Sequence, residues 1–268
     1  MKKVIEFSCF LIILAISFAL PYGNLHIPLR ILTALLTVFP AVLLYRSNIA
    51  LFVPGLFFVI NALVSPSVLI YLQSRDIHVP QLFLLPAIVL YLLVLARVKH
   101  FRKYVHWIQK GNFTRPVIIF TIGLVCLSSI ALIVWAVWIK EDLSRYTAFI
   151  PILPLPMLLL YGLAFPLFNS FFEEFISRAV LYDGFSAIWQ SKTAVIIMQA
   201  SVFALWHYPG FPGGAAGVIM VFCWSIMLGV IRLKARGMLP VLAAHYMADL
   251  TIALILFFMI ILPGGFWI

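Results

Sequence analysis

Nine long apolar runs without a charged residue alternate with short polar segments along the chain. The runs cover residues 7–29, 31–45, 47–74, 79–96, 116–139, 146–172, 193–206, 213–231 and 250–268. About 20 apolar residues in a helix cross the hydrocarbon core of a bilayer, and a helix satisfies its own backbone hydrogen bonds there. None of the runs alternates polar and apolar residues with a period of two, so a barrel is not expected. The pattern predicts an all-α, polytopic membrane protein with about eight or nine transmembrane helices.

The amino-acid composition agrees with this prediction. Of the 268 residues, 65% are hydrophobic and only 10% are charged, whereas a soluble domain carries about 25% charged residues. So few charges cannot cover a globule with polar surface, and we therefore expect lipid to be its main surrounding. We expect no second, soluble domain. The first apolar run is interpreted as an uncleaved first span rather than as a signal peptide.

The net charge of +10 arises from 18 Lys and Arg residues against 8 Asp and Glu residues. The basic residues gather at Lys2 and Lys3, in the loop 97–115 and in the turn 232–236, between apolar runs. Lys and Arg concentrate in the cytoplasmic loops of membrane proteins. We therefore place these segments on the cytoplasmic side, and we expect no nucleic-acid partner.

Three of the acidic residues, Glu173, Glu174 and Asp249, lie in strongly apolar surroundings. A charged side chain near the centre of a transmembrane helix costs about 2.5–3.5 kcal/mol on insertion scales. These residues therefore need either a partner or a function.

The first polar motif joins Glu173 and Glu174 to Arg178. Glu174 and Arg178 are four residues apart, so they share one face of a helix and can pair. Glu173 points about 100° away from Glu174 on that helix. A carboxylate that remains free in an apolar, partly hydrated cavity can act as a general base towards water. The alternative is that all three side chains form one inert ion-pair cluster.

Two further motifs place histidines in apolar surroundings. His207 lies directly before the helix-breaking stretch 209–214. His245 and Asp249 are four residues apart and face the same way on a helix. Asp249 can therefore orient the imidazole, or both side chains can bind one metal ion. The alternatives are a structural histidine at a helix end and a hydrogen-bonded pair that joins two helices.

Together the three motifs resemble those of the type II CAAX prenyl proteases and of their bacterial relatives, the bacteriocin-processing and abortive-infection-type (CPBP) membrane peptidases. The matching residues are Glu173, Glu174, Arg178, Phe203, His207, His245 and Asp249. The resemblance covers roughly residues 150–262. We therefore divide the chain into N-terminal transmembrane helices without a recognised motif, residues 1–145, and a CPBP-like catalytic core, residues 146–268.

The resemblance implies an intramembrane endopeptidase in which Glu173 is the base that activates water. Glu174 would be its partner, tied to Arg178, and His207 would help to position the water. The C-terminal pair of histidine and aspartate would complete the site. The expected partners are the lipid bilayer and a peptide or lipidated protein substrate, and the expected location is the cytoplasmic membrane of a bacterium.

Asp249 differs from the asparagine that many relatives carry at this position. Asparagine can donate a hydrogen bond to an oxyanion, whereas an ionised aspartate only accepts. This difference favours a role in orienting His245 or in binding a metal. Catalytic zinc needs three protein ligands and a water molecule, and Glu173, His207 and His245 form the candidate set. Their spacing is not that of H-E-x-x-H, so the sequence leaves Zn²⁺ undecided.

Two other functions remain open at this stage. A non-catalytic immunity or scaffold protein can keep the fold of a peptidase. A proton-coupled transporter can also use intramembrane Glu, His and Asp side chains, although the chain has no internal repeat of the kind common in transporters. One difficulty concerns the site itself. A straight span over residues 193–207 would place His207 and His245 at opposite faces of the membrane.

Overall fold

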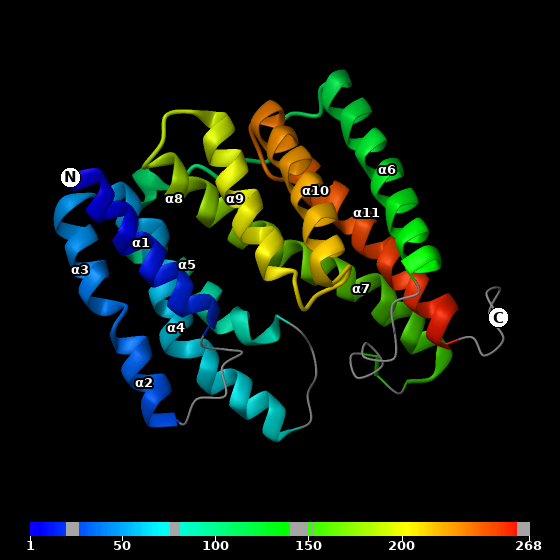
Figure 1. Cartoon of the computed structure of the whole chain (residues 1–268), viewed down its shortest axis with the longest axis horizontal. Helices are drawn as coiled ribbons and strands as arrows, with labels where there is room; N and C mark the ends of the chain where they lie inside the picture. The colour runs from blue at the N-terminus through cyan, green and yellow to red at the C-terminus, as the bar shows by residue number, and fades with distance from the viewer. Residues whose placement is uncertain (20–26, 76–80, 140–149, 152, 262–268) are drawn as a thin grey trace. The chain divides into compact units, whose positions relative to one another are not determined.

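The computed structural model describes residues 1–19, 27–75, 81–139, 150–151 and 153–261. Over these residues the chain is helical and contains no strand. The α-helices are α1 (Lys2–Ala19), α2 (Ile27–Leu35), α3 (Val38–Ser47), α4 (Ile49–Ser74), α5 (Leu85–Arg97), α6 (Arg115–Ile139), α7 (Leu155–Glu174), α8 (Tyr182–Ser186), α9 (Lys192–Trp206), α10 (Gly214–Ala235) and α11 (Leu239–Leu256). Short 3₁₀-helices are η1 (Leu82–Leu84) and η2 (Phe101–Tyr104), and π-helices are η4 (Phe175–Leu181) and η5 (Phe257–Ile261). Figure 1 shows their order along the chain.

Six helical segments in the described part of the chain are long and apolar enough to cross a membrane. They are Pro28–Ser47, Ile49–Ser74, Arg115–Trp138, Leu155–Ser186, Gly214–Ala235 and Leu239–Met259. Two shorter apolar helices cover Leu82–Arg97 and Lys192–Trp206. The predicted all-α, multi-pass class is therefore confirmed for the described residues, whereas the predicted number of eight or nine spans is not confirmed.

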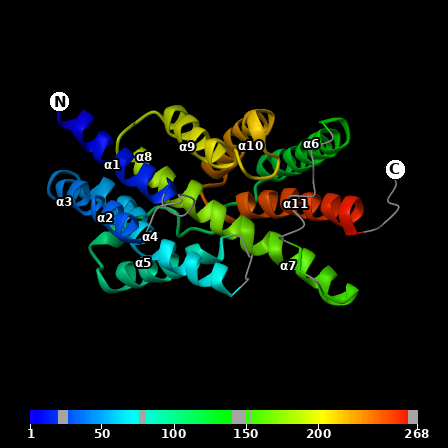
Figure 2. The same ribbon diagram turned by 60° about the horizontal axis from the view of Figure 1, so that its bottom comes forward.

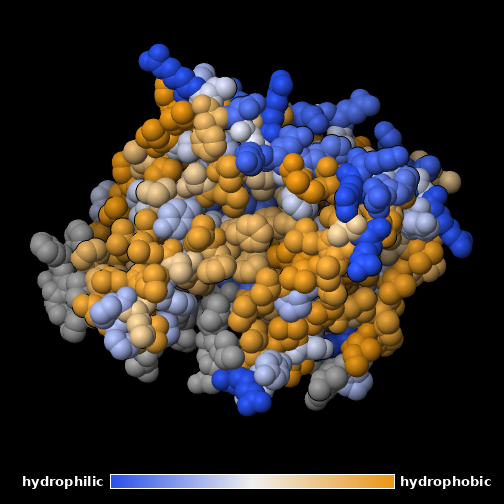
Figure 3. Space-filling model, turned by 180° about the vertical axis from the view of Figure 1, so that it is seen from behind, coloured by the Kyte–Doolittle hydropathy of each residue, from blue (hydrophilic) through white to orange (hydrophobic). Residues whose placement is uncertain are grey.

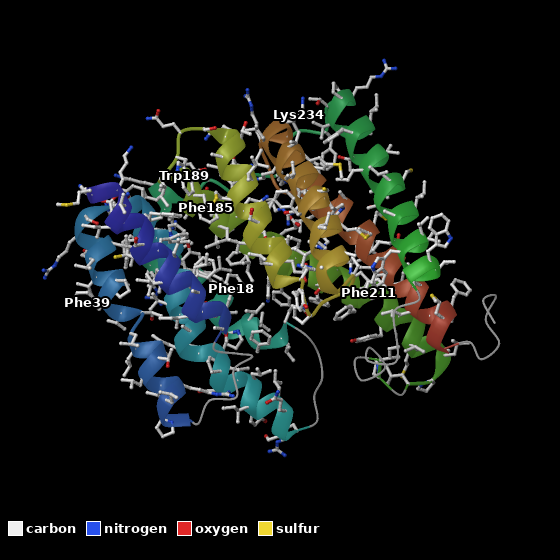
Figure 4. All side chains as sticks on the ribbon, in the orientation of Figure 1. Phe18, Phe39, Phe185, Trp189, Phe211 and Lys234 are labelled. Carbon is white, nitrogen blue, oxygen red and sulfur yellow. The ribbon has the colours of Figure 1, made fainter. Side chains whose placement is uncertain are left out.

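Apolar side chains cover much of the molecular surface, as Figure 3 shows for one face. Phe39 points outward from α3 (Figure 4) and is 71% exposed. Ile119 and Ile130 on α6 and Leu160 on α7 are also more than half exposed. Such exposure would be unfavourable in water, and it is favourable where the surrounding solvent is lipid.

The chain divides into two compact units, which we describe separately. Unit 1 comprises Met1–Trp107 and Ala179–Val195, and unit 2 comprises Ile108–Arg178 and Ile196–Ile268. The sequence-based boundary between residues 145 and 146 was drawn from motifs and lies outside the described residues. The division into residues 1–145 and 146–268 stays a prediction.

In unit 1, α4 is the central helix and contacts α1, α3, α5 and α8. The ring of Phe10 packs edge-to-face on Phe58 and Phe185, with centroids 6.1 and 5.7 Å apart. Gly184 lies directly against that ring, because a Cβ atom there would come within 2.5 Å of it. Aromatic packing therefore holds α1, α4 and α8 together in this unit.

A buried polar network also joins α1 and α4. The Asn61 amide donates to Ser17 Oγ at 2.8 Å, and the Ser65 hydroxyl donates to Asn61 Oδ1 and to the Phe83 carbonyl. Each of these groups would cost free energy in an apolar interior without a partner. The network thus fixes the register of α1 and η1 against α4.

In unit 2, α6, α10 and α11 run side by side, and α11 also packs along α7 (Figures 1 and 2). The core between α6, α10 and α11 is aliphatic and tightly packed. Its buried members are Val117, Leu124, Leu228, Ile231, Ala235, Val241 and Ala244. A second cluster places Phe211 on Trp135, with ring centroids 4.8 Å apart.

Two helices extend beyond the boundaries that the uncharged runs indicated. The run 146–172 stopped at Glu173, but the helix that begins at Leu155 continues through both glutamates to Ser186. The run 250–268 began after Asp249, but α11 begins at Leu239. In both cases buried polar side chains contact the charged residues, so the helix does not need to end at them. Residues 262–268 of that run lie outside the described part.

Three backbone hydrogen bonds join the loop before α6 to the turn between α10 and α11. The amides of Asn112, Met238 and Leu239 donate to the carbonyls of Ala235, Gln109 and Lys110 at 2.8, 2.9 and 2.9 Å. Gly111 and Gly237 meet at this junction, and Gly111 has a φ of +93°. A Cβ atom on Gly237 would overlap the backbone of Gly111.

We therefore expect Gly237→Ala to destabilise the protein. The backbone of the facing loop would have to move, and overpacking of this kind costs about 1–3 kcal/mol. Thermal unfolding in detergent should show a lower Tm. Gly123→Ala on α6 is the matched control, because nothing lies within 4 Å of its added methyl group. Equal Tm values for the two variants would contradict the close contact.

Candidate functional site

Polar side chains from three helical segments of unit 2 meet in one buried cluster. All six predicted catalytic residues belong to it: Glu173 and Glu174 at the end of α7, Arg178 in η4, His207 directly after α9, and His245 and Asp249 in α11. Each is linked to another member by a contact of 3.5 Å or less. The convergence expected from the sequence is present.

Glu173 and Glu174 stand where the α-helix changes to a π-helical turn. Their side chains are 5% and 0% exposed. Single π turns within α-helices are frequent at functional sites. Because adjacent residues on a helix point about 100° apart, the two carboxylates have different neighbours.

Glu174 accepts two hydrogen bonds at a single carboxylate oxygen. Its Oε1 lies 2.8 Å from Nη1 of Arg178 and 2.6 Å from Nδ1 of His245. A carboxylate paired with arginine is an acceptor only, so Nδ1 of His245 carries the hydrogen. The imidazole is held in this orientation, and its Nε2 faces away from Glu174.

Arg178 is fully buried and its charge is compensated. Besides Glu174, its guanidinium donates to Oγ of Ser225 at 2.8 Å. The guanidinium carbon lies 4.6 Å from the ring centroid of Phe203 and 5.7 Å from that of Trp224. Aromatic faces attract cations, and a buried ion pair needs such additional partners to offset its desolvation. The predicted pairing of Glu174 with Arg178 is therefore present.

Glu173 faces both histidines. Its Oε2 lies 3.4 Å from Nε2 of His207 and 3.5 Å from Nε2 of His245. Nδ1 of His207 lies 2.9 Å from the carbonyl oxygen of Phe203, which only accepts, so this nitrogen also carries a hydrogen. Each imidazole is thus anchored through Nδ1 and directs Nε2 towards the same carboxylate.

Asp249 completes the cluster on α11. Its Oδ1 lies 3.4 Å from Nε2 of His245, one helical turn away. Its Oδ2 accepts a hydrogen bond of 2.9 Å from Nδ2 of Asn169. The position of Asp249 agrees with the predicted role of orienting His245.

Asn169 is a member of the site that the sequence reasoning missed. It is four residues before Glu173 on α7, so it lies on the same helix face. The residues predicted from the sequence are charged residues and histidines in apolar runs, whereas the side chain of Asn169 is neutral. The signal available in the sequence was an amide one turn before the paired glutamates.

The separation of His207 and His245 that a straight span over residues 193–207 would have caused does not occur. Helix α9 has only 15 residues and ends at Trp206, while α11 begins at Leu239, so His245 lies in its second turn. A short α9 and an early start of α11 bring both imidazoles to Glu173. A common site for the two histidines requires that one helix be short, and that helix is α9.

The geometry of the cluster bears on the candidate zinc ligands Glu173, His207 and His245. Imidazoles that bind a metal usually donate their other ring N–H to a carboxylate or a carbonyl, as His245 and His207 do here. However, within the described part of the chain no three His, Cys, Asp or Glu side chains form a group that could hold a metal ion. The set Glu173, His207 and His245 stays a prediction, and no reaction step is derived through a metal.

Comparison with known protein families gives a match to part of the chain. Residues 155–251 match the model of a family described as type II CAAX prenyl endopeptidase Rce1-like. The matched segment contains all six predicted catalytic residues and Asn169. No curated protein and no solved structure matches the chain.

The burial of Arg178 gives a prediction about stability. Arg178→Met would leave the buried Glu174 carboxylate without its cation, and breaking a buried pair in this way costs about 3–5 kcal/mol. We expect a large decrease in the Tm of the detergent-solubilised protein. Lys234→Met removes an exposed charge from α10 and should leave the Tm unchanged. A wild-type Tm for Arg178→Met would show that the pair does not stabilise the fold.

Proposed function

Because residues 155–251 match the model of the Rce1-like family of type II CAAX prenyl endopeptidases, we propose that this integral membrane protein hydrolyses a peptide bond of a membrane-associated or lipidated protein. The observation that carries the proposal is the position of Glu173, a buried carboxylate that faces the Nε2 atoms of two anchored histidines. General bases act on water from such positions. The matched family supports peptide-bond hydrolysis as the reaction.

In the proposed reaction Glu173 is the general base. Its carboxylate takes a proton from a water molecule while the water oxygen bonds to the carbonyl carbon of the scissile peptide bond. The carbonyl π electrons move to the oxygen and give a tetrahedral intermediate. When the C–N bond breaks, Glu173 returns the proton to the leaving nitrogen. The site gains and loses nothing over one turnover, and water is the only co-reactant.

The two histidines position the reacting groups. The contacts of 3.4 and 3.5 Å between their Nε2 atoms and Glu173 are slightly longer than the usual hydrogen bond. A water molecule that binds to Glu173 would therefore also lie near both imidazoles. We assign His207 to the water, and we assign His245, protonated on Nε2 as well as on Nδ1, to the developing oxyanion, because Asp249 only accepts hydrogen bonds.

Glu174, Arg178 and Asp249 act through these residues. Glu174 fixes the ring of His245 through Nδ1, and Arg178 neutralises Glu174. The negative charge available for proton transfer therefore stays on Glu173. Asp249 holds the opposite side of the His245 ring through Nε2.

The surroundings of the reaction follow from the surface of the protein. Exposed apolar side chains indicate contact with lipid, and the basic N-terminus and loops favour the cytoplasmic side. We propose the cytoplasmic membrane of a bacterium as its location and a peptide or lipidated protein in that membrane as its substrate. In an alternative mechanism, Zn²⁺ bound by Glu173, His207 and His245 assists the reaction, and removal of the metal by a chelator distinguishes the two mechanisms.

We expect Glu173→Gln to lower peptide-bond cleavage by at least about 100-fold, because general-base catalysis contributes about 10²–10⁴-fold. The purified protein in detergent would be incubated with a library of prenylated and unprenylated peptides, and the products identified by mass spectrometry. Glu6→Gln is the matched control: it makes the same change at a buried glutamate of unit 1. It should keep wild-type turnover.

His207→Ala should abolish cleavage in the same assay while the Tm stays close to that of the wild type, because the imidazole is needed for the water and not for the core. Wild-type turnover of either site variant would refute the mechanism.

Loss of cleavage on addition of a chelator, with recovery on addition of Zn²⁺, would establish a metal. A phenotype in cells that survives both substitutions would indicate a non-catalytic scaffold or immunity protein. Proton flux in liposomes that depends on Glu173 would indicate a transporter.

A further inference from the structure

Asn169 stands between two carboxylates that come from different helices. Its Nδ2 donates to Oδ2 of Asp249 on α11 at 2.9 Å. Glu173 lies one turn further along α7, and its carboxylate is close enough to interact with the same carboxamide. A carboxamide nitrogen carries two N–H donors, so a single nitrogen atom can serve both carboxylates.

The contacts of Asn169 are made through its nitrogen. Its Oδ1 is buried and has no hydrogen-bond partner among the described residues. A buried acceptor without a partner costs about 1–3 kcal/mol, so the side chain is not placed by what its oxygen gains. The hydrogen bond from its Nδ2 to Asp249 therefore determines its orientation.

A neutral donor suits this position better than a cation would. Glu173 and Asp249 both face Nε2 of His245, at 3.5 and 3.4 Å, and their like charges repel. An arginine or lysine between them would relieve the repulsion, but it would also neutralise the base, as Arg178 neutralises Glu174. The amide of Asn169 stabilises both carboxylates and leaves their charge in place.

We propose that Asn169 is a positioning residue that holds Glu173 and Asp249 at Nε2 of His245 in the geometry needed for proton transfer. This inference rests on the proposed function. Asn169 acts through Glu173 and Asp249 and forms no bond with the substrate. Removing it should therefore affect the rate of the chemical step more than the binding of the peptide.

The first test is the turnover of Asn169→Ala. We expect kcat to fall by at least about tenfold, since small displacements of catalytic groups have effects of this size, while KM stays within about twofold. Ser170→Ala is the matched control, because its hydroxyl is bonded only to the carbonyl of Leu167 in its own helix. It should keep both constants. Wild-type kcat for Asn169→Ala would overturn the inference, and the isosteric Asn169→Asp is used in its place if the alanine variant does not fold.

The second test exchanges Asn169 and Asp249. It distinguishes a positioning role of Asn169 from a hydrogen bond that only stabilises the fold. Asn169→Asp alone should lower both Tm and kcat, because it places two carboxylates against each other. The double variant Asn169→Asp/Asp249→Asn restores a donor and an acceptor across α7 and α11, so most of the Tm should return. We expect kcat to remain low, because Glu173 still lacks its amide donor. Full recovery of kcat would overturn the inference.

Glu173→Gln, measured in parallel, distinguishes this inference from the proposed function. If Glu173→Gln is inactive and Asn169→Ala is fully active, only the role of Asn169 is wrong. If Glu173→Gln keeps wild-type turnover, the proposed function itself is wrong.

Discussion

The hydrogen bonds at Oε1 of Glu174 are the interaction on which unit 2 depends. One oxygen receives Arg178 from the same helical segment and His245 from α11. Buried charges are tolerated only when they are paired and hydrogen-bonded. The ion pair therefore removes the cost of a charged residue in an apolar interior, and it also fixes the imidazole that faces Glu173.

The two adjacent glutamates show that a shift of one residue along a helix gives the same type of side chain a different chemical role. Glu174 points to a cation and becomes part of the framework, whereas Glu173 points to two imidazole rings whose Nδ1 atoms are already engaged. The apolar helices around them exclude bulk water, which strengthens each electrostatic contact. Structural and reactive carboxylates can thus be neighbours on a single turn of helix.

The sequence was sufficient to predict the helical class and six of the polar side chains that meet in the cluster, because charged residues and histidines in an apolar run are conspicuous; the catalytic roles of these six stay a prediction. It was not sufficient to predict helix ends: charges mark the end of a run, yet Glu173 and Asp249 lie within helices that continue past them. Contacts between helices, such as that of Glu174 with His245, depend on packing that spacing alone does not determine. Asn169 was overlooked because it is neutral.

The pairing of Glu174 with Arg178 within one helical segment has a consequence for biogenesis. Helices leave the ribosome one after another, and this segment is synthesised about 60 residues before α11. A segment that carries its own counter-ion can partition into lipid without waiting for a later helix. His245 then docks onto a carboxylate that is already neutralised, so this contact between the two helices does not bury a new isolated charge.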